Sequence, residues 1–290
     1  MLPGDAVAAA YRDACLAELA ALKPGNVHVF AAGHDMTTAD FEASAQASAP
    51  AMGAPALSVG ARIFEAIQRT RQAVGCNTNL GIVLLCAPLA QAALSSAEGS
   101  LRDRLGRILE RLDVADAEQA FAAIRMAEPG GLGAAPQHDV HAPPTVSLAV
   151  AMAAAANRDF IAAQYAGGFG DIFDLGLPRF RAGLARWRSE RWAATSAYLA
   201  FLARLPDSHV ARKYGIDRAQ AVSVMARPLA ERLDEAEDPE QLAAPLLGFD
   251  QELKAAGLNP GTSADLTVAS LFAHRLEVGE NGQVGENGPC

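Results

Sequence analysis

The sequence lacks the features that nucleic-acid-binding and membrane proteins usually need. Its net charge is −9 and it contains no basic run, which argues against the basic face of a nucleic-acid binder. The longest apolar run, residues 81–94, contains a proline and a glutamine. It is also shorter than the roughly 20 residues of a membrane span. The start of the chain has no signal-peptide pattern. We therefore expect a cytoplasmic protein that binds neither nucleic acid nor membrane.

Cysteine pairs, aromatic residues and strand patterns are also scarce. The four cysteines include no close CxxC pair, so neither a zinc knuckle nor a disulfide framework is predicted. Aromatic residues make up 6% of the chain although 51% of it is hydrophobic, so the core must consist mainly of Ala, Leu, Val and Ile. No stretch of about six residues alternates apolar and polar side chains with β-branched enrichment, which disfavours strands.

Helical periodicity between short breaks runs along most of the chain. We predict an all-α fold, a single compact multi-helix domain of about 12–13 helices. Residues 1–277 are expected to form this catalytic domain, and the polar, glycine-rich residues 278–290 a disordered tail. Thr37 and Asp116 are candidate N-caps. The expected helices are 5–22, 38–54, 57–75, 80–95, 99–112, 116–128, 145–156, 158–174, 178–190, 192–205, 216–235, 239–256 and 263–277.

Chemically reactive and charged side chains collect in five polar connectors between these helices. The connectors are residues 21–41, 75–81, 128–144, 205–215 and 258–270. Backbone N–H groups at helix starts with glycine nearby form anion sites. In the last connector Gly261 would permit close approach, and Thr262 and Ser263 would add hydroxyls. This pattern suits a phosphate, although an ordinary capped helix start would look the same.

Acidic and histidine side chains in the connectors suggest two kinds of metal site. Mg²⁺ would need carboxylates from several segments, and aspartates are spread in that way. The loop residues His138, Asp139 and His141 could bind a transition metal or belong to a solvated loop. Asp171 and Asp174, three apart on one expected helix, could form a carboxylate pair or a solvated helix end.

Four of the connector sequences resemble a known family. "KPGNVHVFAAGHDM", "NTNLG", "LPDSHVARKYG" and "NPGTSADL" resemble, in order, blocks of the triphosphoribosyl-dephospho-CoA synthase family, from about residue 10 to 275. The resemblance implies an all-helical transferase of coenzyme or prosthetic-group biosynthesis. Such an enzyme would displace adenine from ATP with an acceptor hydroxyl, that of 3′-dephospho-CoA in the synthases. It also implies Mg²⁺ with ATP and a small-molecule acceptor as partners, and it leaves a homodimer open.

The same resemblance assigns candidate site residues, block by block. It gives catalytic roles to His34, Asp35 and Asp207. It gives metal-binding roles to Asp35, Asp207 and Asp265. The residues it implies for binding the substrate and its phosphates are Lys23, Gly25, Asn77, Thr78, Arg212, Lys213, Gly261, Thr262 and Ser263.

Several positions depart from the family pattern. Asn79 and Leu80 stand where the synthases have His and Lys, and His28 stands where they have Asp. These departures resemble a divergent branch linked to tetrahydromethanopterin or methanofuran biosynthesis, with a different acceptor. His28 and the loop 138–141 are then candidates for recognising that acceptor. A phosphate-ester or N-glycosyl hydrolase and a non-catalytic nucleotide-binding helical protein are the other interpretations.

Overall fold

The structure, a computed structural model, describes residues 1–30 and 37–286 of the chain. These residues form 14 α-helices, one π-helical turn and one 3-10 turn, and they contain no β-strand. The all-α prediction is therefore confirmed, with more helices than expected. Within the described part of the chain, no helix is both long and apolar enough to cross a membrane.

The helices follow one another with short connections. In chain order they are α1 (Gly4–Ala20), α2 (Thr38–Gly53), α3 (Val59–Val74), α4 (Leu80–Leu94), α5 (Leu101–Glu110), α6 (Val114–Ala127), α7 (Leu148–Ala155), α8 (Phe160–Ala166), η1 (Ile172–Gly176), α9 (Leu177–Trp187), α10 (Glu190–Arg204), α11 (Ser208–Tyr214), α12 (Ile216–Glu235), η2 (Pro239–Leu242), α13 (Ala243–Ala255) and α14 (Gly261–Glu286).

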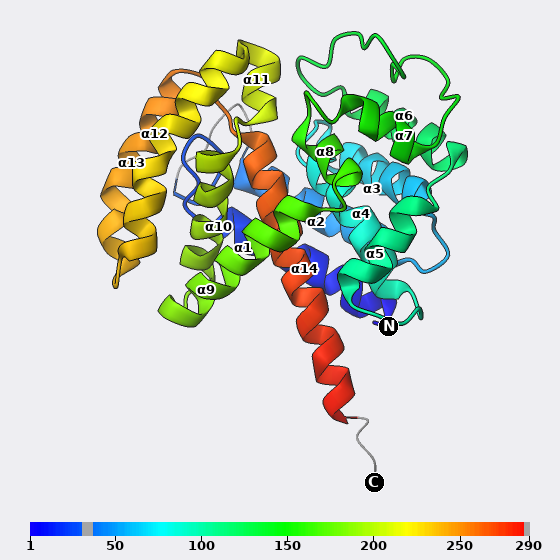
Figure 1. Ribbon diagram of the computed structural model, residues 1–290, viewed down its shortest axis with the longest axis horizontal. Helices are drawn as coiled ribbons and strands as arrows, with labels where there is room; N and C mark the ends of the chain where they lie inside the picture. Colours follow the sequence, from blue (N-terminus) through cyan, green and yellow to red (C-terminus); the bar gives the residue numbers. More distant parts are fainter. Residues whose placement is uncertain (31–36, 287–290) are drawn as a thin grey trace.

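Two groups of helices flank the central helices α1 and α14. Helices α3 to α8 lie on one side and α9 to α13 on the other (Figure 1). The hydrophobic core continues from one side to the other through α10. Phe201 of α10 packs in the larger cluster of buried residues, whereas Tyr198 and Leu202 pack in the smaller one. The two groups of helices therefore share one core, and the site described below lies between them.

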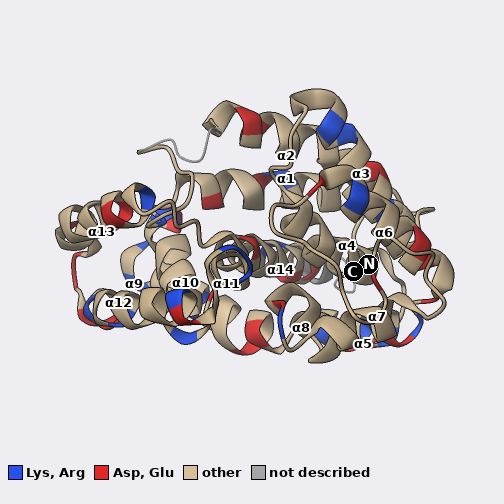
Figure 2. Cartoon of the chain, turned by 90° about the horizontal axis from the view of Figure 1, so that it is seen from above, with Lys and Arg blue, Asp and Glu red and all other residues tan. Residues whose placement is uncertain are grey.

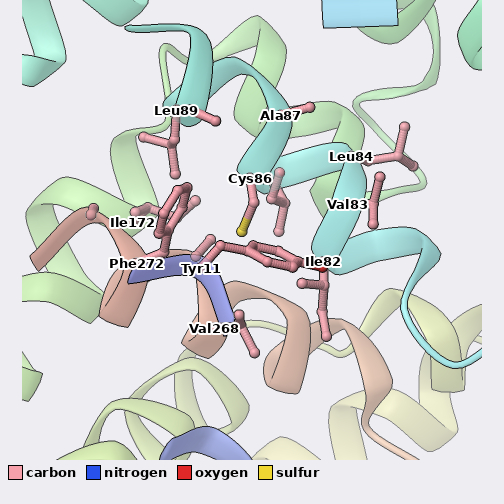
Figure 3. Packing of buried hydrophobic residues seen from close by; sticks show 14 of the residues in the cluster. Tyr11, Ile82, Val83, Leu84, Cys86, Ala87, Leu89, Ile172, Val268 and Phe272 are labelled. Atoms are coloured by element: carbon pink, nitrogen blue, oxygen red, sulfur yellow. The ribbon is translucent and has the colours of Figure 1, made fainter. Parts of the chain in front are cut away.

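Small side chains dominate the centre of the core, as the composition predicts. Tyr11 is a large exception, and it lies among residues of α4 and α14 (Figure 3). Its ring meets the ring of Phe272 edge-on, with centroids 5.9 Å apart. Its hydroxyl lies 3.0 Å from the hydroxyl of Ser48 on α2. Because a buried phenol needs a polar partner, this contact fixes α1 against α2 as well as against α14.

Close helix packing also depends on glycine where α3 crosses α6. A Cβ atom on Gly60 would lie 2.4 Å from the Cα of Asp116. The backbone N–H of Gly60 donates a hydrogen bond of 2.8 Å to the Asp116 carboxylate. The side chain expected to cap α6 therefore has another role. Asp113 is the N-cap, and Asp116 sits three residues later in a reciprocal capping box. The expected cap at Thr37 is confirmed for α2.

Three differences from the predicted helices stand out. The expected helix 158–174 is interrupted, because α8 ends at Ala166 and the π-helical turn η1 begins at Ile172. The connector at residues 205–215 contains α11, which the sequence analysis missed because it is short and polar. Helix α14 continues to Glu286, so residues 278–286, expected in the disordered tail, are helical. Packing explains part of this extension, because Glu280 forms an ion pair with Arg104 of α5.

Replacing Gly60 with alanine should destabilise the protein. The added methyl group would meet backbone atoms that cannot rotate away, and overpacking of this kind costs about 1–3 kcal/mol. Gly106→Ala in α5 is the matched control, because no atom lies within 4 Å of its added Cβ. That change should stabilise by about 0.5–1 kcal/mol. Urea unfolding followed by circular dichroism measures both, and equal free energies of unfolding for the two variants would contradict this packing.

Candidate active site

One large cavity brings the five polar connectors together. Its volume is about 1010 Å³, at the upper end of the roughly 300–1,000 Å³ typical of small-molecule sites. Each connector contributes lining residues, among them Asn26, Asn77, His138, Arg212 and Asp265. A cavity of this size can hold more than one substrate, as a transferase requires.

Hydrogen bonds fix the first connector to α13 and to the last connector. The N–H of Gly25 donates to the Asp250 carboxylate at 2.8 Å, and the Asn26 amide donates to Asn259 at 2.7 Å. Gly25 has a φ of +83°, and a Cβ there would lie 2.8 Å from Pro260. Gly25, expected at a substrate, is therefore required for close contact between two connectors.

His28 is part of the same attachment. Its Nε2 lies 3.2 Å from the Asp250 carboxylate, and its side chain is fully buried. Burial lowers the pKa of His28, which keeps the ring neutral. Its side chain is not among those that line the cavity. The hypothesis that His28 recognises the acceptor is therefore not supported, and its contact with Asp250 gives it a structural role.

Lys23 also differs from its expected role as a phosphate ligand. Its side chain is 1% exposed and forms an ion pair with Glu18 of α1. It also donates a hydrogen bond of 3.2 Å to Asn26. Glu18, and not Lys23, lines the cavity. The sequence analysis missed Glu18 because it lay within an expected helix. Its position one turn before the Lys-Pro-Gly sequence was the available signal.

Asp207 holds the start of α11 against the start of α14. One carboxylate oxygen accepts from the N–H groups of His209 at 2.9 Å and Val210 at 3.1 Å. The other accepts from the N–H and the hydroxyl of Ser263, both at 2.8 Å. These four donors fill the roughly four acceptor positions of a carboxylate. The geometry therefore supports a positioning role for Asp207 and Ser263 rather than the catalytic, metal-binding and substrate-binding roles that were expected.

Asp265 is placed differently from Asp207. It lines the cavity, and its carboxylate forms no hydrogen bond or ion pair within the described part of the chain. Burial, reinforced by the nearby charges of Glu18, Asp207 and Asp159, raises the pKa of Asp265 well above its usual range. We call Glu18 and Asp265 the inner carboxylates of the cavity.

Gly81 leaves the space that Asp265 occupies. A Cβ on Gly81, in the first turn of α4, would lie 2.0 Å from an Asp265 carboxylate oxygen. It would also lie 2.7 Å from the side chain of Ile161. Any other residue at this position would therefore displace the carboxylate from the cavity wall.

The expected metal ligands do not form a metal site in the described part of the chain. His34 and Asp35 lie outside the described residues. Asp207 is engaged by protein donors, and no group of three or more His, Cys, Asp or Glu side chains among residues 1–30 and 37–286 is arranged to hold a metal ion. In the 128–144 connector, Asp139 accepts from the N–H groups of Ala135 and His141, at 2.7 and 2.8 Å. The transition-metal interpretation of that loop is therefore not supported.

The second connector contributes both lining and packing residues. Asn77 lines the cavity, and its side chain accepts a hydrogen bond of 3.1 Å from the N–H of Leu80 at the start of α4. Thr78 also lines it and donates to Ser44 of α2 at 2.6 Å. Both were expected at the substrate, and the structure brings both to the cavity.

The two departures at the start of α4 have different environments. Leu80 lines the cavity. Asn79 instead turns into the protein, where its amide donates to Ser48 at 3.2 Å and to Thr70 at 3.0 Å. Only Leu80 can therefore affect a substrate directly.

Basic side chains surround the cavity where it is exposed. Arg71, Arg158, Arg212 and Lys213 line it and come from three separate segments, and we call them the basic rim. Figure 2 shows the basic part of α11 close to α14. Arg212 lies 3.4 Å from the Asp159 carboxylate and donates to the carbonyl of Gly130 at 3.1 Å. The rim can attract anions, whereas the inner carboxylates lie deeper in the cavity.

The start of α14 provides the remaining expected residues. Gly261 and Thr262 both line the cavity. A Cβ on Gly261 would lie 2.4 Å from the His209 ring, so glycine is required for this contact. The Thr262 hydroxyl lies 2.9 Å from that of Ser208. The N–H groups of Gly261, Ser263 and Ala264 already donate within the protein, to Asn259, Asp207 and Pro260. Among the described residues, only the N–H of Thr262 at this helix start is left for an anion, fewer donors than the sequence predicts.

Asp171 and Asp174 do not form a carboxylate pair. The Gln164 amide donates to Asp171 at 2.7 Å. Asp174 forms an exposed ion pair with Arg102. The interpretation as a solvated helix end fits Asp174 better than a site does.

Comparison with known proteins agrees with this arrangement. Residues 4–284 match the family model described as "CitG: ATP:dephospho-CoA triphosphoribosyl transferase". The chain belongs to this family. A crystal structure from Archaeoglobus fulgidus, described as a candidate triphosphoribosyl-dephospho-CoA synthase, superposes with a TM-score of 0.61 at 23% identity. It covers 81% of this chain and 98% of that one, which shows a shared fold.

Curated relatives match over a shorter part of the chain. A protein from Pseudomonas fluorescens, named a probable 2-(5''-triphosphoribosyl)-3'-dephosphocoenzyme-A synthase, is 33% identical over 122 residues, which are 41% of this chain and 40% of that protein. One of the same name from Azotobacter vinelandii is 34% identical over 113 residues, or 38% and 37% of the two chains. The similar segment thus spans less than half the length of these relatives.

Removing the charge of Asp207 should loosen the contact between α11 and α14. In Asp207→Asn one oxygen becomes an NH₂ group that faces N–H donors, and a hydrogen bond to a charged group contributes about 1.5–3 kcal/mol. Ser263→Ala, which removes one of the four donors, should lose about 1.5–3 kcal/mol, and Asp207→Asn, which weakens several of these bonds at once, should lose more. Chemical denaturation gives both free energies of unfolding. A larger loss for Ser263→Ala than for Asp207→Asn would contradict the role given to Asp207.

Proposed function

We propose that this protein transfers the triphosphoribosyl group of ATP to an acceptor hydroxyl and releases adenine, with 3′-dephospho-CoA as the acceptor. The observation that carries the proposal is the convergence of all five connectors on one cavity, in a chain that matches the transferase family from residue 4 to 284. The product would be a precursor of a coenzyme or prosthetic group.

The charges of the cavity suggest how ATP is oriented. The triphosphate lies at the basic rim, where arginine can form charge-assisted hydrogen bonds to phosphate oxygens. The N–H of Thr262, at the start of α14, can add one further donor. The ribose then lies further in, near the inner carboxylates, which would repel a triphosphate but can accept hydrogen bonds from sugar hydroxyls.

Magnesium enters this proposal as part of the substrate. The described residues provide no cage of three acidic ligands, and Mg²⁺ commonly binds through substrate phosphates with only one or two carboxylates. The triphosphate therefore supplies most of its ligands. Asp35, outside the described residues, remains a proposed ligand from the first connector.

Leu80 affects which acceptor the cavity can bind. It lines the cavity, and by the resemblance of the "NTNLG" block the synthases carry a lysine at this position, so this chain has one positive charge fewer there. Arg212 and Lys213 supply cations to the same cavity. The rim can thus replace the missing charge, which keeps dephospho-CoA as the proposed acceptor.

The proposed reaction predicts adenine release that depends on an acceptor. Incubation with ATP, magnesium and dephospho-CoA should yield free adenine and a triphosphoribosylated product, both measured by chromatography. Omitting dephospho-CoA should abolish the release. Release of adenine without any acceptor would identify a hydrolase, and ATP binding without release would identify a binding protein. Either outcome contradicts the proposal.

Truncating the basic rim should weaken ATP binding while leaving the fold intact. A charge-assisted hydrogen bond contributes about 1.5–3 kcal/mol, so Arg212→Ala or Lys213→Ala should raise the KM for ATP about tenfold or more. Arg218→Ala, an exposed arginine of α12 outside the cavity, is the matched control and should leave KM unchanged. Initial rates at varied ATP concentration measure this. Equal KM values for all variants would remove the rim from the phosphate site.

A further inference from the structure

The two inner carboxylates lie in one cavity but differ in their partners. Lys23 binds one oxygen of Glu18 and is itself buried. The other Glu18 oxygen has no hydrogen-bond partner within the described residues, and Glu18 lines the cavity. Asp265 has no basic partner in contact and faces the same space. A neighbouring ammonium stabilises an ionised carboxylate, whereas burial without a cation stabilises a neutral one.

Displacement of adenine at a ribose carbon involves two proton movements. The departing purine is a poor leaving group unless one of its nitrogens is protonated. The attacking hydroxyl must lose its proton as its oxygen bonds to the sugar carbon. Enzymes carry out such paired steps with two titratable groups whose environments hold them in opposite protonation states.

We propose that Asp265 is the general acid that protonates the leaving adenine and that Glu18 is the general base that accepts the proton of the attacking hydroxyl. This assignment rests on the proposed function. The bond between the ribose C1′ and the purine N9 breaks, and its electron pair leaves with adenine, which receives the Asp265 proton. The acceptor oxygen bonds to C1′, and its proton moves to Glu18. Transfer of that proton to Asp265 through water restores the starting state, so no other reactant is consumed.

The charges around the pair favour these states. Lys23, from the connector after α1, is the cation closest to Glu18. Glu18 itself, Asp207 before α11 and Asp159 before α8 add negative charge near Asp265, and Lys23, without contacting Asp265, opposes them in part. From α1 and α4, the thiols of Cys15 and Cys86 face the same region, and burial raises the pKa of both, so they stay neutral. Burial raises the pKa of Glu18 too, and Lys23 partly offsets this.

Lys23 and Gly81 are positioning residues in this account. Lys23 fixes one Glu18 oxygen and leaves the other for the substrate. Gly81 leaves space for the Asp265 oxygen, because a Cβ there would lie 2.0 Å from it. Neither residue needs to touch the reacting atoms.

The test compares Asp265→Asn and Glu18→Gln with wild type under single-turnover conditions, using ATP and ATP methylated at purine N7. The methylated base carries a positive charge and departs without a proton from the enzyme. General acid or base catalysis contributes about 10²–10⁴-fold. Asp265→Asn should therefore lose at least about 100-fold with ATP but less than tenfold with the methylated substrate. Glu18→Gln should lose a similar factor with both.

The pH dependence separates the two roles. Wild-type turnover should fall at low pH as Glu18 is protonated and at high pH as Asp265 is ionised. Asp265→Asn should lose the decline at high pH, and Glu18→Gln the decline at low pH. Asp174→Asn, an exposed carboxylate outside the cavity, is the control and should keep both.

An infrared measurement tests the protonation state without turnover. At neutral pH wild type should show the carbonyl stretch of a protonated carboxylic acid, and Asp265→Asn should lose it while Asp174→Asn retains it. Absence of this band in wild type would overturn the acid role. So would an equal loss by Asp265→Asn on both substrates, or rescue of that variant by raised magnesium. If wild type released no adenine with any acceptor, that result would contradict the proposed function itself, and the acid and base roles would fall with it.

Discussion

The four hydrogen bonds that Asp207 accepts are the interaction on which the cavity depends. They join the starts of α11 and α14, and so help to bring the basic residues of α11 and the inner carboxylate of α14 to the same cavity. Burying a carboxylate is costly unless its oxygens are satisfied, and here all acceptor positions are used. The Asp207 carboxylate has all its hydrogen-bond donors only when both helix starts are in place, so the contact stabilises one arrangement of the two segments.

In that arrangement, basic and acidic side chains lie at different depths of the cavity. Arginine and lysine occupy the exposed rim, where water still solvates them, and Glu18 and Asp265 lie further inside. Lys23 contacts Glu18 directly, whereas its charge reaches Asp265 only without contact and lowers the pKa of Asp265 less than burial raises it. In the proposed mechanism these environments give two chemically similar side chains different protonation states, and the charges of the cavity orient ATP with its triphosphate at the basic rim.

The sequence predicted the helical fold well because periodicity, capping and composition all agree. Through the family resemblance it also assigned site residues to four of the five connectors, and residues of all five line the cavity. Individual roles were harder to predict. Lys23, Asp207 and His28 carry reactive groups but are buried and serve other residues. Glu18 was missed because it lies within an expected helix, and the lysine that contacts it follows in the next connector. Motif spacing indicates which residues converge, whereas burial and partners decide which of them face the substrate.

The most direct test of the central claim is a crystal structure of the protein with MgATP. The account predicts the triphosphate between Arg212, Lys213 and the start of α14, with the ribose C1′ facing Glu18 and Asp265. It also predicts that Lys23 stays bound to Glu18 and contacts no phosphate. A nucleotide bound with its triphosphate against the inner carboxylates, or outside this cavity altogether, would contradict the account.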